Sequence, residues 1–205
     1  MFEESLVAGD AAFSELFRSI EYQAAEALRS ALASQRGEEP PPQLLDAWDR
    51  FTKELRLSLL GTELLRRMDA IDLDLADIEA EDLLLAATVA WVYPEAAGPD
   101  QAAGLEPTTT LECVDWLPVV AFLGSEGVGA DAAPDRLAAM ALTKHPATDR
   151  PDIGSAEFVH LEEEFAEVLP IWELVGITED HHLTAVGRWL LPRAFTRAWG
   201  TEFDD

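Results

Sequence analysis

The chain has 205 residues and a formal net charge of −26, with 40 acidic side chains against 14 basic ones. Residues 1–105 hold 21 acidic and 8 basic residues and the remainder 19 and 6, so each half carries −13 and the acidity is not confined to a tail. Such a surface disfavours direct contact with DNA, RNA or anionic lipid, because like charges repel. Hydrophobic residues make up 48%, which permits a packed core and argues against global disorder.

The cysteine content and the length of the apolar runs indicate which cellular compartment to expect for this protein. Cys113 is the only cysteine, which excludes an intrachain disulfide and suits a reducing environment. The N-terminus lacks the basic and apolar regions of a signal peptide. The longest apolar run, from Leu83 to Tyr93, falls well short of the ~20 residues that span a bilayer. We therefore expect a cytoplasmic protein without a membrane segment. Salt adaptation, genome bias and mimicry of nucleic-acid charge remain open as causes of the acidity.

Apolar residues in the first half recur at three- and four-residue steps, which predicts helices. The expected helices run from Asp10 to about Ser34, from Gln43 to Leu60, from Thr62 to Ile71 and from Asp77 to Tyr93. Prolines 40–42 separate the first two, because proline lacks the amide donor that a helix needs. We interpret residues 1–93 as a helical domain and residues 94–110, rich in Pro, Gly and Ala, as a linker.

Residues 111–205 are expected to form a second domain of helices and one β-hairpin. The predicted helices are Leu111–Leu123, kinked or delayed by Pro118, then Asp135–Lys144, a long helix from the cap Ser155 to Val175 with a bend near Pro170, and a final helix from the cap Thr184 towards Trp199. Between the last two, Gly176-Ile177 and His182-Leu183 are predicted as very short strands around a turn at residues 178–181.

The segment Leu183-Thr184-Ala185-Val186-Gly187-Arg188-Trp189-Leu190-Leu191 has the pattern LTxxGRxxL. It resembles the element that follows the wing in MarR-like and PadR-like winged-helix regulators. Together with residues 172–177 it is similar to a winged-helix module of uncharacterised actinobacterial proteins. The resemblance covers residues 110–200 only by the order of elements, and the N-terminal half not at all. It implies a mainly α fold, in which a helical N-terminal unit precedes a winged-helix-like unit with a short β-hairpin.

The long helix before the hairpin departs from a DNA-reading winged helix. That helix would enter the major groove and should be neutral or basic. Here it has no Lys or Arg and carries Glu157, Glu162, Glu163, Glu164, Glu167 and Glu173. Because each phosphate contact needs a cation, nucleic acid is an unlikely partner for this helix.

No motif for catalysis, metal or cofactor binding is complete. Glu157 and His160 have the spacing of a di-iron helix, but no second such pair occurs. The acidic positions between Asp69 and Asp77 lack the glycine of a calcium loop, and a solvated edge explains them better. Cys113 with a histidine could form a catalytic pair, although a lone cysteine on an apolar helix is more often part of the core. We therefore predict no catalytic, cofactor-binding or metal-binding residue.

These observations favour a non-enzymatic adaptor or regulatory protein that acts through protein–protein contacts, with homodimerisation as one form of contact. The predicted partner-binding residues lie on the final helix and are Arg188, Trp189, Arg193 and Arg197. The simpler alternative for the arginines is that they complement the helix dipole and pair with nearby glutamates. Two other functions stay open: a winged-helix transcription regulator that contacts DNA through these arginines, and an enzyme with a dispersed site.

Overall fold

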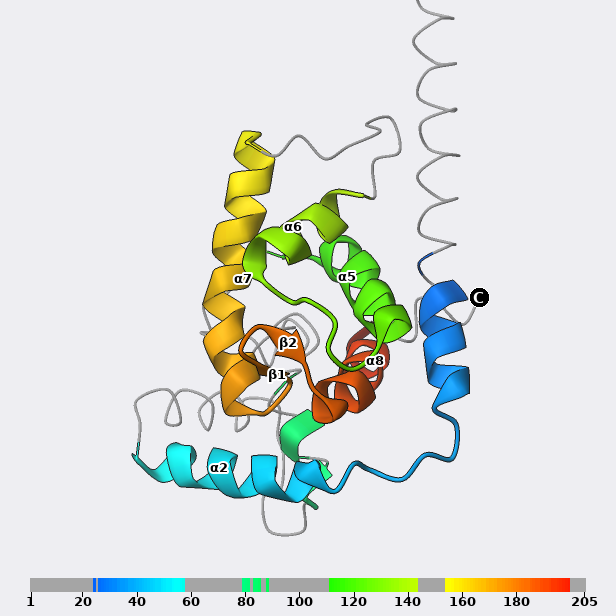
Figure 1. Cartoon of the computed structure of the whole chain (residues 1–205), viewed down its shortest axis with the longest axis vertical. Helices are drawn as coiled ribbons and strands as arrows, with labels where there is room; N and C mark the ends of the chain where they lie inside the picture. The colour runs from blue at the N-terminus through cyan, green and yellow to red at the C-terminus, as the bar shows by residue number, and fades with distance from the viewer. Residues whose placement is uncertain are drawn as a thin grey trace, which may run out of the picture.

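The computed structural model describes residue 24, residues 26–57, residues 79–81, 83–85 and 88, residues 111–143 and residues 154–199; the side chains of 51–57 and 197–199 are not described. The described part is mainly helical, with one small antiparallel hairpin (Figure 1). The elements follow in the order α2 (Gln43–Leu57), α5 (Cys113–Glu126), α6 (Pro134–Leu142), α7 (Ala156–Leu174), β1 (Thr178–Glu179), β2 (His182–Leu183) and α8 (Ala185–Trp199). The predicted mainly α fold with a short β-hairpin is confirmed at this level.

The C-terminal helices α5–α8 form a bundle around a core of large apolar side chains. α6 packs on both α5 and α7, and α8 packs on α5 (Figure 1). Trp116, Phe165 and Trp172 are fully buried at the centre, with the Trp116 ring edge-on to Phe165 at 5.2 Å between centroids. α5 and α7 both contribute to this cluster, so it joins the two helices in the core.

The loop between α5 and α6 joins the hairpin as a third antiparallel segment. Gly129 N donates to Leu183 O at 2.8 Å, and Leu183 N donates to Ala130 O at 2.9 Å. A bridge between Asp131 and His182 continues this pairing. The loop therefore supplies one edge of a small sheet.

The end of α7 determines where the hairpin starts. Ile177 N donates to Trp172 O, and Gly176 N donates to Glu173 O, which is the bond pattern of a Schellman cap. Gly176 has φ +78°, and a β-carbon there would lie 3.0 Å from the Ala47 Cβ of α2. Glycine is thus needed both for the left-handed turn and for the close approach of α2.

The first strand of the hairpin is shifted from its predicted position, whereas the second lies at residues 182–183 as predicted. Thr178 pairs with Leu183 and Glu179 with His182, so the first strand is residues 178–179 and not residues 176–177. Only Asp180 and His181 form the turn, with φ values of +49° and +61°. A two-residue turn of this kind requires positive φ at both positions, which Asp and His tolerate better than most residues. Ile177 belongs to the cap of α7 instead.

Several helix boundaries also differ from the prediction. α5 runs through Pro118 and Gly124 to Glu126 without the delayed start. α6 ends at Leu142, two residues before the predicted Lys144. The predicted cap Ser155 is confirmed, since its hydroxyl accepts a hydrogen bond from Phe158 N at 3.1 Å. The predicted helix at residues 62–71 and the linker at 94–110 lie outside the described residues.

Segments from the N-terminal half share the core of the bundle. Leu28 lies in the helical segment 26–34, Leu44 and Ala47 in α2, and Leu84 within the predicted fourth helix; all are buried in one cluster with α5–α8. α2 runs across one end of the bundle beside the hairpin and α8 (Figure 1). The division into two domains stays a prediction. Buried residues from both of the predicted domains lie in one core.

Candidate functional site

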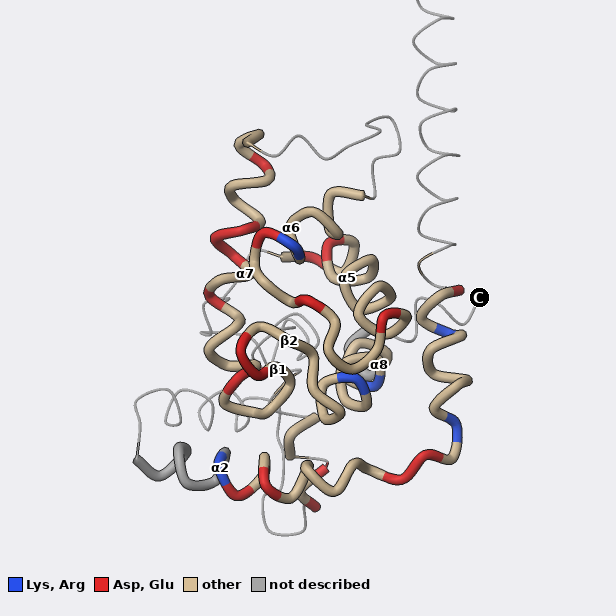
Figure 2. The backbone as a smooth tube through the Cα atoms, viewed as in Figure 1, with Lys and Arg blue, Asp and Glu red and all other residues tan. Residues whose placement is uncertain are grey.

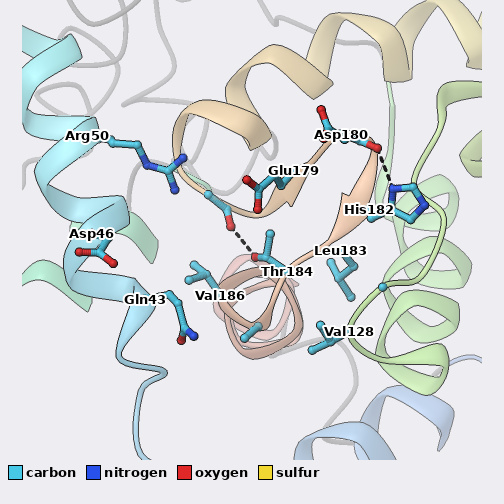
Figure 3. Close-up of a pocket in the computed structure, with 13 residues that line it drawn as sticks. Gln43, Asp46, Arg50, Val128, Glu179, Asp180, His182, Leu183, Thr184 and Val186 are labelled. Carbon is cyan, nitrogen blue, oxygen red and sulfur yellow. Dashed lines mark hydrogen bonds between the residues drawn. The ribbon is translucent and has the colours of Figure 1, made fainter.

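An open groove lies where α2 meets the hairpin and the start of α8, and its volume is about 550 Å³ (Figure 3). α2 contributes three polar side chains on one side, and the hairpin with the α5–α6 loop paired to it lines the other side. The lining residues are Gln43, Asp46, Arg50, Val128, Gly129, Gly176, Glu179, Asp180, His182, Leu183, Thr184, Ala185 and Val186. The groove thus combines residues from both halves of the chain.

Thr184 connects the hairpin to α8 at the floor of this groove. Its hydroxyl lies 2.5 Å from Gly176 O and 3.1 Å from Ile177 O, and it accepts a hydrogen bond from Gly187 N at 3.0 Å (Figure 3). The predicted role of Thr184 as the cap of the final helix is confirmed. Because the same hydroxyl bonds to both elements, it holds the N-terminus of α8 against the turn after α7.

Gly187 allows α8 to pack closely against the hairpin. A β-carbon at this position would lie 2.2 Å from Ile177 O and 2.7 Å from Leu183 Cδ1. No side chain larger than hydrogen fits at such distances. Glycine at this position therefore permits the close approach of α8 to the hairpin.

Charged groups surround the groove. Asp46, Glu179 and Asp180 provide carboxylates, and Arg50 extends its guanidinium from α2 towards the hairpin (Figure 3). His182 Nδ1 lies 2.7 Å from Asp180 O; a carbonyl only accepts, so Nδ1 carries a proton in this contact. The lining contains no Cys, Ser or Lys, and its one hydroxyl, on Thr184, caps a helix. The groove offers carboxylates, a guanidinium and an imidazole as hydrogen-bonding and charged groups.

The predicted partner-binding residues lie elsewhere, where α8 contacts the segment that follows residue 34. The Arg188 guanidinium forms two hydrogen bonds with the Glu38 carboxylate, at 3.1 and 3.3 Å. Arg193 donates to Gln35 Oε1 and to Trp189 O, each at 2.6 Å, and lies 4.1 Å above the Trp189 ring. Trp189 itself is only 5% exposed. The side chain of Arg197 is outside the described residues, so partner binding stays a prediction for it.

Burial and neighbouring charges shift the pKa of Arg193 in this contact. Burial lowers the pKa of the Arg193 guanidinium from its usual value, while the carboxylates of Glu81 and Glu38 act in the opposite direction and Arg188 adds to the lowering. The residue is nevertheless charged at neutral pH, since arginine titrates far above it. Arg188 and Arg193 are therefore engaged within the chain as cations.

Gln35 is the residue of this contact that the sequence pattern did not single out. It is 1% exposed, and its Nε2 donates to Arg188 O at 3.0 Å. In an unbroken helix that carbonyl would accept from residue 192, but Pro192 has no amide hydrogen. The side chain of Gln35 replaces the missing donor. The signal was present in the sequence as a proline inside the final helix, but nothing local identified the residue that would satisfy the exposed carbonyl.

Replacing Gln35 with alanine is expected to lower the free energy of unfolding by about 2 kcal/mol, because the partly buried Arg188 carbonyl and Arg193 guanidinium each lose a partner. Arg188→Ala is the matched control: it removes an ion pair that is about one-third exposed and should cost no more than about 1 kcal/mol. Urea unfolding followed by circular dichroism measures both. Equal losses for the two variants would contradict the role given to Gln35.

The remaining candidates from the sequence are not assembled into a site. His160 Nδ1 lies 4.0 Å from Glu164 Oε1 on the surface of α7, and no group of three potential metal ligands occurs among the described residues. Cys113 lies half-buried at the start of α5. The acidic positions from Asp69 to Asp77 and His145 are outside the described residues.

Comparison with known proteins found no family model, no curated protein and no solved structure that matches this chain. Within the described residues, the structure has no helix of the length and apolar character that would cross a bilayer. The function must accordingly be inferred from the geometry and charge of the molecule itself.

Proposed function

We propose that this chain is a non-enzymatic adaptor or regulatory protein, whose C-terminal helices and hairpin form a winged-helix-like unit that contacts a protein and not DNA. The order of α5, α6, α7, hairpin and α8 supports this arrangement. So does the pairing of the α5–α6 loop with β2, because a short third strand from that connection completes the small sheet beside the wing. The unit would lie in the cytoplasm and need no cofactor.

The distribution of charge is the observation on which the choice of a protein partner rests. In a DNA-reading arrangement α7 would be the groove helix, yet the exposed side chains along it include Glu157, Glu163, Glu167 and Glu173. The hairpin adds exposed Glu179 and Asp180. Figure 2 shows this side of the molecule with acidic positions and no basic ones on α7 or the hairpin. Phosphates would meet only like charge there.

The arginines of α8 do not offset the negative charge of α7 and the hairpin for DNA binding. Arg188 is paired with Glu38, and Arg193 is held by Gln35 and the Trp189 ring. A transcription regulator that contacts DNA through these two side chains would first have to break contacts within the chain. A protein partner that carries Lys or Arg, in contrast, would gain attraction from α7 and the hairpin without such a rearrangement.

Titration of the whole chain into a fluorescent random-sequence DNA duplex at low salt is expected to show no saturable rise in anisotropy. A photo-crosslinking residue at Glu163 on α7, introduced in the native cell, is expected to form a discrete adduct with another protein. The same residue at Arg29, which is exposed on the opposite half of the chain, serves as the matched control and should not form that adduct. An adduct of twice the chain mass would identify the partner as a second copy.

Saturable DNA binding that weakens steeply with salt would replace the proposal with the transcription-regulator alternative. Failure of Glu163 to crosslink, together with a monomeric mass by light scattering, would contradict protein contact through α7.

A further inference from the structure

A second groove lies between the proline-rich loop, the start of α2 and residues 79–81, and its volume is about 530 Å³. Its apolar lining comes from three consecutive prolines, two leucines and one alanine, and its acidic lining from three glutamates. These residues are Pro40, Pro41, Pro42, Leu44, Leu45, Ala80, Glu39, Glu79 and Glu81. None of them was part of the predicted site, and none contributes to the groove beside the hairpin.

The apolar side of this groove includes a leucine side chain that is largely exposed to solvent. Leu45 is 65% exposed, more than Val128 at 60% and Val159 at 43%, the other large apolar side chains on the described surface. Leu44, its neighbour in α2, is 4% exposed and belongs to the core. Leu45 is therefore turned away from the interior and offers apolar surface that nothing in the described chain covers.

The proline wall is rigid, and its backbone is already bonded. Prolines fix φ and have no amide hydrogen to offer a ligand. The carbonyls of Pro41 and Pro42 accept hydrogen bonds from Leu44 N and Leu45 N, at 2.8 and 3.3 Å. A ligand therefore meets a preformed apolar surface, whose ordering costs little entropy, and must find its polar partners among the carboxylates.

Those carboxylates determine the charge of the occupant. Glu39 and Glu79 are exposed, and their carboxylates make no hydrogen bond or ion pair with any residue that the structure describes. Positive side chains beside an apolar one would match this arrangement, and the charge of −26 would draw such a ligand towards the surface. We propose that this groove binds a segment of a partner protein in which apolar side chains stand next to lysine or arginine.

A second copy of this chain is a poorer occupant. The other exposed apolar side chains on the described surface, Val128 and Val159, have acidic neighbours along the chain: Glu126 and Asp131 for the first, Glu157 and Glu162 for the second. Docking either of them into the groove would bring carboxylates against Glu39 and Glu79, which costs free energy. This inference does not depend on the winged-helix-like arrangement or on contact through α7.

The test is an NMR titration of the full-length, isotope-labelled chain with a short synthetic peptide of leucine and lysine, and with a peptide in which serine replaces each leucine. The leucine–lysine peptide is expected to saturate and to shift the backbone amides of Leu45 and Ala80. The serine–lysine peptide, of equal charge, should bind at least about tenfold more weakly, because it buries no apolar side chain. Equal affinity of the two peptides would show attraction by net charge alone and would overturn the proposal.

Leu45→Ser is expected to weaken the leucine–lysine peptide about tenfold, since this exposed side chain supplies apolar contact and little stability. The double variant Glu39→Gln, Glu79→Gln should weaken it several-fold and reduce the dependence on salt. Val159→Ser on α7 is the matched control and should leave the affinity within about twofold. A loss with Val159→Ser equal to that with Leu45→Ser would place the peptide on α7. Concentration-dependent shifts at Leu45 without peptide would identify a second copy as the occupant; either result overturns the proposal.

Discussion

Replacing Gly187 with alanine is expected to lower the free energy of unfolding by about 3 kcal/mol, because the added methyl group overlaps backbone atoms that cannot move. The β-carbon would lie 2.2 Å from Ile177 O. That carbonyl accepts from Thr184 N at 3.0 Å and lies within reach of the Thr184 hydroxyl. Moving it would therefore also disturb the cap of α8, which adds to the loss. Urea unfolding followed by circular dichroism measures the change.

Gly124→Ala is the matched control for this variant, because it also places alanine within a helix. Its β-carbon would lie 3.1 Å from the Ala31 Cβ, a contact that a small shift of two side chains relieves. Both variants gain the same helix propensity, about 1 kcal/mol, so the difference between them reports packing alone. Similar stabilities of the two variants would show that α8 is not held against the hairpin as closely as described.

Trp116→Ala is expected to cost about 4 kcal/mol, within the range for removal of a large aromatic side chain from a core. Trp116 is 0% exposed, and its ring contacts Phe165 edge-on and Trp172 at 5.7 Å between centroids. Removing the ring takes away the contact that joins α5 to α7, and the rigid helices on both sides cannot close the cavity. Thermal and urea unfolding, followed by circular dichroism, both measure the loss.

Val159→Ala provides the surface control for Trp116→Ala, since Val159 is 43% exposed on α7 and should change stability by less than about 0.5 kcal/mol. Trp116→Phe, which keeps part of the aromatic contact, is expected to fall between the two. Near-native stability of Trp116→Ala would mean that this cluster does not organise the bundle.

Local signals in the sequence predicted well those features that depend on interactions between residues close together in the chain. The hydroxyls of Ser155 and Thr184 accept amide hydrogen bonds at the starts of their helices, as the sequence indicated. Helix ends were less accurate: the apolar pattern of α5 stops at Leu123, but the backbone bonds continue to Glu126 and end at Gly127, where φ is +83°. The first strand of the hairpin was placed two residues too early, because the Schellman cap of α7 takes up residues 176–177.

Contacts between residues far apart in the chain could not be predicted in this way. Gln35 reaches residues of α8 more than 150 positions away, and no local pattern indicates that its amide replaces the donor that Pro192 lacks. Likewise, the arginines of α8 formed one predicted set, but in the structure Arg188 pairs with Glu38 and Arg193 with Gln35. Both grooves are also assembled from separate segments, and their lining residues share no sequence pattern.

Composition and periodicity thus determined that this protein is acidic throughout and builds its core from amphipathic helices, because charge and helix period are properties of the chain itself. The tertiary structure decided which of those charges remain available to a partner. It buried Gln35 against α8 and engaged Arg188 and Arg193, while it left four of the six glutamates of α7 exposed and Leu45 uncovered. Burial and pairing depend on distances between segments, which a linear sequence does not contain.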